Sequence, residues 1–85
     1  MKLSDEQLHI AAQINARVRH LEQDGCDEMT IFVSMAPFMP SFKRLLDTAG
    51  QQGMDELCAQ FDSFYHYAKI LEHIAGAIRS GDIKV

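Results

Sequence analysis

The spacing closest to known chemistry is Glu6 with His9, a single Glu-x-x-His. On a helix this spacing places a carboxylate and an imidazole on one face, as in di-iron helical bundles. Those bundles need two such pairs and further carboxylates directed into the core, whereas Glu6 and His9 fall outside the apolar stripe of their own segment. We therefore expect a solvated first turn and no metal site, unless a symmetric dimer brings two copies together.

A second pair of candidate ligands, His66 and His73, lies near the C-terminal end, with Asp62 and Lys69 on the same helical face. Two helical turns separate the histidines by about 10 Å, which is too far for both to bind one metal ion. Their face is opposite to the apolar stripe of the segment, so we expect it to be exposed to solvent. No cofactor is predicted.

Nucleophilic chemistry is equally weakly indicated. Cys26 and Cys58 form no Cys-x-x-Cys motif, which favours reduced thiols and a cytoplasmic location over a disulfide framework. Because polar residues 4–7 directly follow the start, we do not expect the apolar region of a signal peptide. There is no Gly-x-Ser-x-Gly, no phosphate-binding glycine loop and no His-Glu-x-x-His, so we do not expect an enzyme.

Composition limits the remaining function classes. The 85 residues are enough for one helical domain, 1–85, with a small core, which leaves oligomerisation open. Twelve acidic and eight basic residues give a net charge of −4, and the basic residues are scattered, so nucleic-acid binding is not expected. The most apolar run, 31–39, is much shorter than the about 20 residues that span a bilayer, so no membrane partner is expected.

The elements that must position any site are predicted to be helices. Ser4 and Gln7 form a capping box, and the apolar residues that follow repeat at steps of three and four as far as Asp24-Gly25. This pattern predicts a first helix over about residues 5–23.

The middle segment is predicted to be a broken helix. Residues 30–33 are β-branched and aromatic and could pass for a strand, but no second strand exists to pair with them. We therefore expect a helix over about 27–36, a break at Pro37–Pro40 and a further helix over 41–48 that ends at Gly50. The apolar residues Phe42, Leu45 and Leu46 of this further helix are expected to face inward.

The last segment carries the longest apolar stripe. Its period predicts one uninterrupted helix over about 54–80, with Gly81 as a left-handed cap. The stripe consists of Leu57, Phe61, Phe64, Ala68, Leu71, Ala75 and Ile78. Together, the three predicted helices make a small all-α, up-down-up bundle. Its last helix, at about 40 Å, is longer than the first by about 12 Å.

Two regions are candidates for contact with a partner. The middle segment is more apolar than one helical face requires, and its methionines suit an adaptable surface. In the last helix, two tyrosines flank the stripe, and Gly76 costs about 1 kcal/mol relative to alanine unless another helix approaches it closely. The predicted partner-binding residues are Met29, Phe32, Met35, Phe38, Met39, Tyr65, Tyr67, Leu71, Ala75, Gly76 and Ile78.

These observations favour a non-enzymatic protein-interaction or regulatory module that forms a homodimer. The alternative is a carrier of a small molecule, metal or cofactor, held between the kinked middle helix and the aromatic centre of the last one. A third interpretation, an acidic decoy for a nucleic-acid site, fits the charge but lacks an aligned row of carboxylates.

Overall fold

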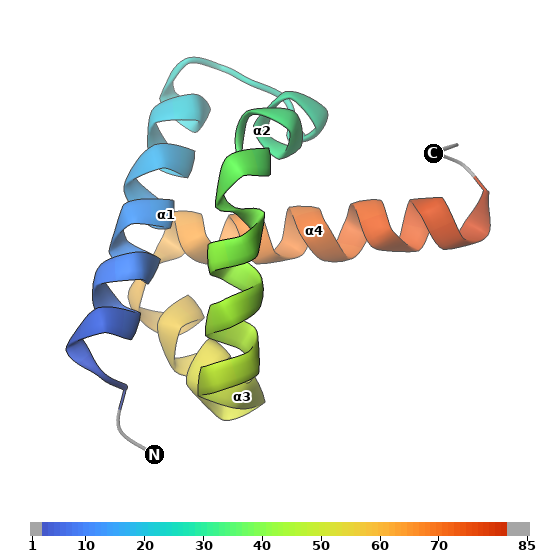
Figure 1. The fold of residues 1–85 in the computed structure, drawn as a ribbon. Coiled ribbons are helices and arrows are strands. Elements are labelled where there is room, and N and C mark those ends of the chain that lie inside the picture. The colour runs from blue at the N-terminus through green and yellow to red at the C-terminus, as the bar shows by residue number, and fades with distance from the viewer. Residues whose placement is uncertain (1–2, 82–85) are drawn as a thin grey trace.

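The computed structural model describes residues 3–81 as a succession of helices (Figure 1). The elements are α1 (Asp5–Gln23), α2 (Glu28–Ser34), the 3₁₀ helix η1 (Ala36–Phe38), α3 (Met39–Gln60) and α4 (Asp62–Ser80). No β-strand occurs among residues 3–81, so the prediction of a small all-α bundle is confirmed.

Side-chain caps define the first two helices. The Ser4 and Gln7 side chains each accept a hydrogen bond from the other residue's backbone N–H, at 3.1 and 2.8 Å, which confirms the predicted capping box. The Asp27 carboxylate accepts from the Thr30 N–H at 2.8 Å and begins α2. The β-branched residues 30–33 are therefore helical, as predicted.

The middle of the chain bends twice. The predicted break is present but begins earlier than Pro37, because α2 ends at Ser34 and η1 separates it from α3, whose first turn already contains Pro40. A second bend lies at Gly50, whose φ of 70° is left-handed. The helix resumes at once, and a Cβ on Gly53 would lie 2.6 Å from the Ala49 Cβ, so only glycine fits there. The prediction that the helix ends at Gly50 is thus replaced by a kink within α3.

The predicted uninterrupted helix over 54–80 is wrong in one respect, because the chain breaks at Phe61. This residue is extended, with φ −127° and ψ 102°, and α4 starts after it. The apolar period continues across the break because Phe61 still packs against the core, so the pattern alone did not reveal it. Since α1 and α4 both have 19 residues, the predicted difference in their lengths also disappears.

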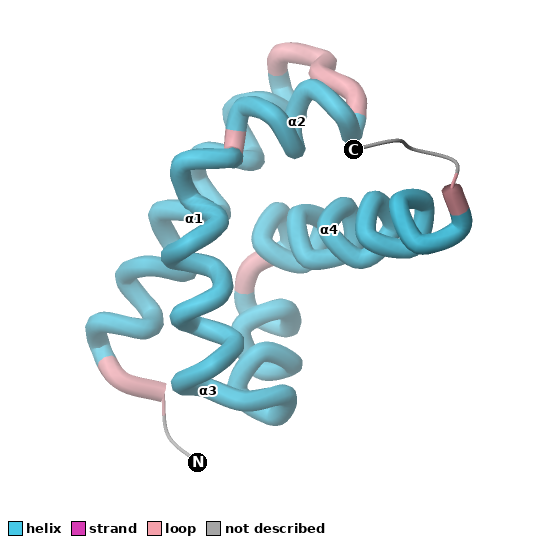
Figure 2. The backbone as a smooth tube through the Cα atoms, turned by 45° about the vertical axis from the view of Figure 1, so that its right-hand side comes forward, coloured by secondary structure: helices cyan, strands magenta, loops and turns pink. Residues whose placement is uncertain are grey.

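The break turns α4 across the other helices. Figures 1 and 2 show α1 and the first half of α3 running alongside each other, whereas α4 crosses them, so the exact up-down-up topology is not confirmed. The core-facing residues of α4 are Ser63, Phe64, Tyr67, Ile70 and Ile74. Of these residues, only Phe64 belongs to the predicted stripe. The prediction extended one helical period over residues 54–80, and the break at Phe61 changes which residues of α4 face the core.

The length and apolar character of a helix decide whether it could cross a membrane. No helix within 3–81 combines the length and the apolar character needed to cross a membrane.

Candidate functional site

The beginning of α4 is fixed by side chains from α1. The Asn15 carboxamide oxygen accepts a hydrogen bond from the Phe64 N–H at 2.8 Å, and so supplies a cap that α4 lacks locally. The Glu22 carboxylate accepts from the Ser63 hydroxyl at 2.7 Å and contacts the His66 Nδ1 with its other oxygen. We call these five residues the α1–α4 junction.

Electrostatics at this junction favour the charged carboxylate. Burial raises the pKa of Glu22, but hydrogen bonds from Ser63 and His66, together with the nearby charges of His66 and Arg19, outweigh it and leave the pKa lowered. The junction is therefore a satisfied polar contact that holds two helices together. Its serine is buried and donates to the carboxylate instead of to the imidazole, so it does not form a Ser-His-acid nucleophile.

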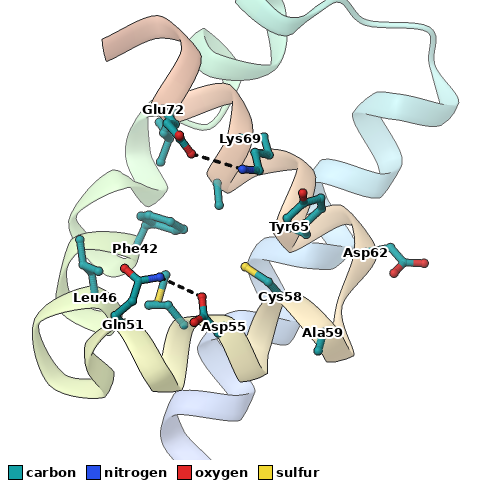
Figure 3. Close-up of a pocket in the computed structure, with 13 residues that line it drawn as sticks. Phe42, Leu46, Gln51, Asp55, Cys58, Ala59, Asp62, Tyr65, Lys69 and Glu72 are labelled. Atoms are coloured by element: carbon teal, nitrogen blue, oxygen red, sulfur yellow. Dashed lines mark hydrogen bonds and ion pairs between the residues drawn. The ribbon is translucent and has the colours of Figure 1, made fainter. Parts of the chain in front are cut away.

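The opposite face of α4 lines a groove with a volume of about 790 Å³, which we call the α3–α4 groove (Figure 3). It lies where the chain folds back at Gly50 and again at Phe61. Its lining residues are Phe42, Leu46, Gln51, Met54, Asp55, Cys58 and Ala59 from α3, and Asp62, Tyr65, Ala68, Lys69, Leu71 and Glu72 from α4.

The inner surface of the groove is apolar and rests on the core. The ring of Phe42 packs against the rings of Phe64 and Tyr67, with centroids 5.4 and 5.3 Å away. Nearer the opening, Leu46 and Tyr65 remain 44% and 48% exposed although both are large and largely apolar. The groove therefore has a fixed inner surface and an incompletely covered apolar mouth.

Polar groups surround this mouth. On α3, the Asp55 carboxylate accepts from the Gln51 carboxamide at 2.8 Å. On α4, the Lys69 ammonium lies 3.6 Å from the Glu72 carboxylate and 5.5 Å from the ring centroid of Tyr65. Figure 3 shows Asp55 and Glu72 on opposite sides of the hollow, on different helices.

The thiol of Cys58 is directed toward the hollow (Figure 3). Burial raises its pKa, the Asp55 carboxylate raises it further, and the opposing effect of Lys69 does not compensate. At neutral pH the group is therefore a thiol and not a thiolate, which makes it a weak nucleophile. The groove presents apolar surface, and its one thiol is not activated.

The predicted partner-binding residues do not form one surface. Tyr65 and Leu71 line the groove. Met29 and Met39 are exposed on α2 and α3, whereas Phe32 and Phe38 are half-buried against the core.

Two of the predicted partner contacts are corrected. Met35 and Tyr67 are fully buried in the core, so no partner can reach either side chain in this structure. Met35 follows the last residue of α2, where the chain turns inward before the proline break. Tyr67 lies on the core side of α4 because the break at Phe61 changes the phase of the helix.

The second half of α4 has the rest of the predicted contacts. Ala75 and Ile78 are exposed, and Gly76 is half-buried, with no atom within 4 Å of the place where a Cβ would lie. The close approach predicted at Gly76 therefore does not come from the described part of this chain. Beside it, a second hollow of about 560 Å³ is lined by Glu28, Lys69, Glu72, His73, Gly76, Ala77 and Ser80.

The remaining candidate ligands from the sequence lie apart. His73 is exposed, as predicted, and its Nδ1 lies 3.0 Å from the Glu28 carboxylate, while His66 is only half-exposed and belongs to the junction. Within the described range of 3–81, no three His, Cys, Asp or Glu side chains come together in a way that could hold a metal ion.

Sequence reasoning missed most of the groove. Leu46 was predicted to face inward, and Met54, Asp55 and Cys58 were not singled out as groove residues. The available signal was the i,i+4 apolar pair of Phe42 and Leu46. With Leu45 already buried in the core, Leu46 is one apolar residue more than the core-facing stripe of this helix needs. That pair meets α4 only because of the two bends, which the apolar period did not indicate.

Comparison with known proteins adds no functional assignment: no family model, curated protein or solved structure matches this chain. What the geometry defines is a small all-α protein with an open apolar groove on one face of its last helix.

Proposed function

We propose that this chain is a non-enzymatic protein-interaction module that binds its partner through the α3–α4 groove. The observation that carries the proposal is the incompletely covered apolar mouth formed by Leu46 and Tyr65 over a fixed inner surface. Tyrosine is enriched at protein interfaces, where its ring is buried and its hydroxyl stays polar. A cytoplasmic location belongs to the same proposal and is supported by the free thiols of Cys26 and Cys58.

The proposal is tested by native mass spectrometry of the chain purified from its own host. We expect a complex with a polypeptide other than this chain, which is lost in Leu46→Ser and kept in Val33→Ser. Val33 is the matched control, because it is 62% exposed but lies on α2, outside the groove. A wild-type spectrum without any polypeptide other than this chain, or equal loss in both variants, would contradict the proposal.

Self-association is the second part of this proposal. The exposed Ala75 and Ile78, next to the open Gly76, give a second copy a place to pack closely against α4. Sedimentation at micromolar concentration should give a dimer for the wild type and for Leu46→Ser, and a monomer for Ile78→Ser. A monomeric wild type would remove the homodimer and leave the groove proposal intact.

A small-molecule carrier is the second candidate function. It is favoured by the groove volume of about 790 Å³, which falls within the about 300–1,000 Å³ typical of ligand pockets. The same spectrum distinguishes the two functions, because a small ligand adds only a few hundred daltons, on the order of a drug-sized molecule, and a partner adds a whole polypeptide.

A further inference from the structure

The chemistry of the α3–α4 groove restricts the kind of protein segment that can occupy it. Its walls are helices, whose backbone N–H and C=O groups, away from the bend at Gly50 and the break at Phe61, are already hydrogen-bonded within each helix. An extended peptide would find no strand edge to pair with among residues 3–81, and its own backbone groups would be left unpaired against apolar surface. A helical segment satisfies its own backbone and presents only side chains, so the occupant is expected to be a helix.

The charges around the groove restrict the sequence of that helix. Of the 13 residues that line the groove, three are carboxylates, namely Asp55, Asp62 and Glu72, and one is a cation, Lys69. Lys69 lies 3.6 Å from Glu72 and near the Tyr65 ring, but the two charged side chains are 53% and 73% exposed, so this weak pair leaves the Glu72 carboxylate able to meet a further cation. The lining residues therefore sum to a net charge of −2, from three negative groups and one positive group, and to −1 without Asp62, which points away from the hollow, in a chain of net charge −4.

The placement of these charges matches one helix type. Asp55 stands on the α3 side of the apolar surface and Glu72 on the α4 side, while Asp62 points away from the hollow (Figure 3). A helix with an apolar stripe bordered on both sides by Lys or Arg would bury its stripe between these walls and bring a cation to each carboxylate. An acidic helix would meet like charge at Asp55 on one side and at Glu72 on the other, where Lys69 is the one cation of the lining.

We propose that the groove binds a basic amphipathic helix of a partner protein, with apolar residues at i, i+3 or i+4 and i+7 and with Lys or Arg bordering them. This inference rests on the proposed function and adds the chemistry of the partner to it. Leu46, Phe42 and Tyr65 contact the apolar stripe, and Asp55 and Glu72 pair with the basic border.

Three synthetic peptides of equal length test the proposal against the full chain. The first is an amphipathic helix of Leu and Lys, the second has Glu at every Lys position, and the third has the composition of the first without its apolar stripe. Binding is measured by fluorescence anisotropy at low and moderate salt, and the site is located by chemical-shift changes in the ¹⁵N-labelled chain. We expect the first peptide to shift groove resonances and to bind at least about tenfold more tightly than the others.

Paired variants separate the local charges from the overall acidity of the chain. The double variant Asp55→Asn with Glu72→Gln should lower the affinity for the first peptide by about three- to tenfold at low salt, as expected for the loss of two exposed ion pairs. Glu6→Gln with Glu56→Gln removes the same net charge outside the groove and should change the affinity by less than about twofold. Leu46→Ser should weaken binding at both salt concentrations, because it removes apolar contact.

Each contrary result has a separate meaning. Equal binding of the basic and acidic amphipathic peptides in the groove, or equal effects of the two charge variants, would overturn the basic-helix inference and leave the proposed function standing. Shifts confined to residues outside the groove would overturn the inference as well. The proposed function itself is decided by the native mass spectra of Leu46→Ser and Val33→Ser, which do not depend on any chosen peptide.

Discussion

The two faces of α4 are covered to different degrees by the rest of the chain. On one face, the α1–α4 junction provides hydrogen-bond acceptors for the first turn of α4 from side chains that are far away in the sequence. Phe64 and Tyr67 are fully buried on this face. On the other face, the α3–α4 groove leaves Tyr65 half exposed beside an apolar hollow. The first face holds the fold together, and the second carries the proposed binding surface, so neighbouring residues on one helix are expected to differ in what they contribute.

The largest change in the free energy of unfolding is expected when one of two adjacent aromatic residues is replaced. Phe64→Ala should lower the free energy of unfolding by about 3–5 kcal/mol, because it leaves a cavity in the core. Tyr65→Ala should cost less than about 1 kcal/mol, since its ring is already half exposed. Urea titrations followed by circular dichroism measure both values, and similar losses for the two variants would show that the faces do not differ.

The next test removes the cap that α1 supplies. Asn15→Ala should cost about 1–2 kcal/mol, because the Phe64 N–H loses its acceptor in a partly buried position. Asn15→Asp keeps an acceptor oxygen and should cost less. Gln13→Ala, on the exposed side of α1, serves as the control and should stay within about 0.5 kcal/mol of wild type in the same titrations. If Asn15→Ala left the free energy of unfolding unchanged, the junction would not stabilise α4.

A smaller effect of the opposite sign is expected at Tyr67. Its hydroxyl is buried and has no hydrogen-bond partner among the described residues, and burial alone raises its pKa. Tyr67→Phe removes this unpaired group and should leave the stability unchanged or raise it by up to about 1 kcal/mol. Thermal unfolding compared with Tyr65→Phe measures the difference. A clear loss of stability in Tyr67→Phe would reveal a partner for the hydroxyl.

The smallest expected effect is the pH dependence from Glu22. Because its pKa is lowered in the folded state, the folded chain holds this proton less tightly than the unfolded chain does. The stabilisation is therefore complete above the ordinary pKa of 4.5 and is lost as the pH falls through the folded-state pKa. Between pH 5 and pH 3, wild type should lose about a few tenths of a kcal/mol more than Glu22→Gln.

Ser63→Ala gives a graded control for that experiment. It removes one of the hydrogen bonds that lower the Glu22 pKa, so its loss of stability between pH 5 and pH 3 should lie between those of wild type and Glu22→Gln. Identical pH profiles for all three proteins would exclude the carboxylate as a source of acid sensitivity.

The sequence predicted the features that depend on local chemistry. The capping box at Ser4 and Gln7, the helical state of residues 30–33, the break at Pro37–Pro40 and the left-handed cap at Gly81 were all predictable, because each depends on residues within one or two turns. The break at Phe61 was not predictable in this way. The next helix receives its cap from Asn15, which no local pattern can reveal.

The groove was unpredictable for a related reason. Its two aromatic walls, Phe42 and Tyr65, come together only after the chain bends at Gly50 and breaks at Phe61. Local periodicity assigns Leu46 to the core and Tyr67 to the edge of the apolar stripe, whereas Leu46 is 44% exposed and Tyr67 is fully buried. Both differences follow from the way α4 is set against α3, which depends on contacts between distant parts of the chain.

The remote cap of α4 also bears on the order in which the chain folds. The hydrogen bonds of the α1–α4 junction join residues 41, 44 and 49 positions apart, so about half of the 85-residue chain must be looped before any of them forms. Until then the first turn of α4 lacks that acceptor, and a helix of this length has little stability by itself. We therefore expect α4 to become ordered together with its docking on α1, in a single cooperative step that couples the two ends of the described chain.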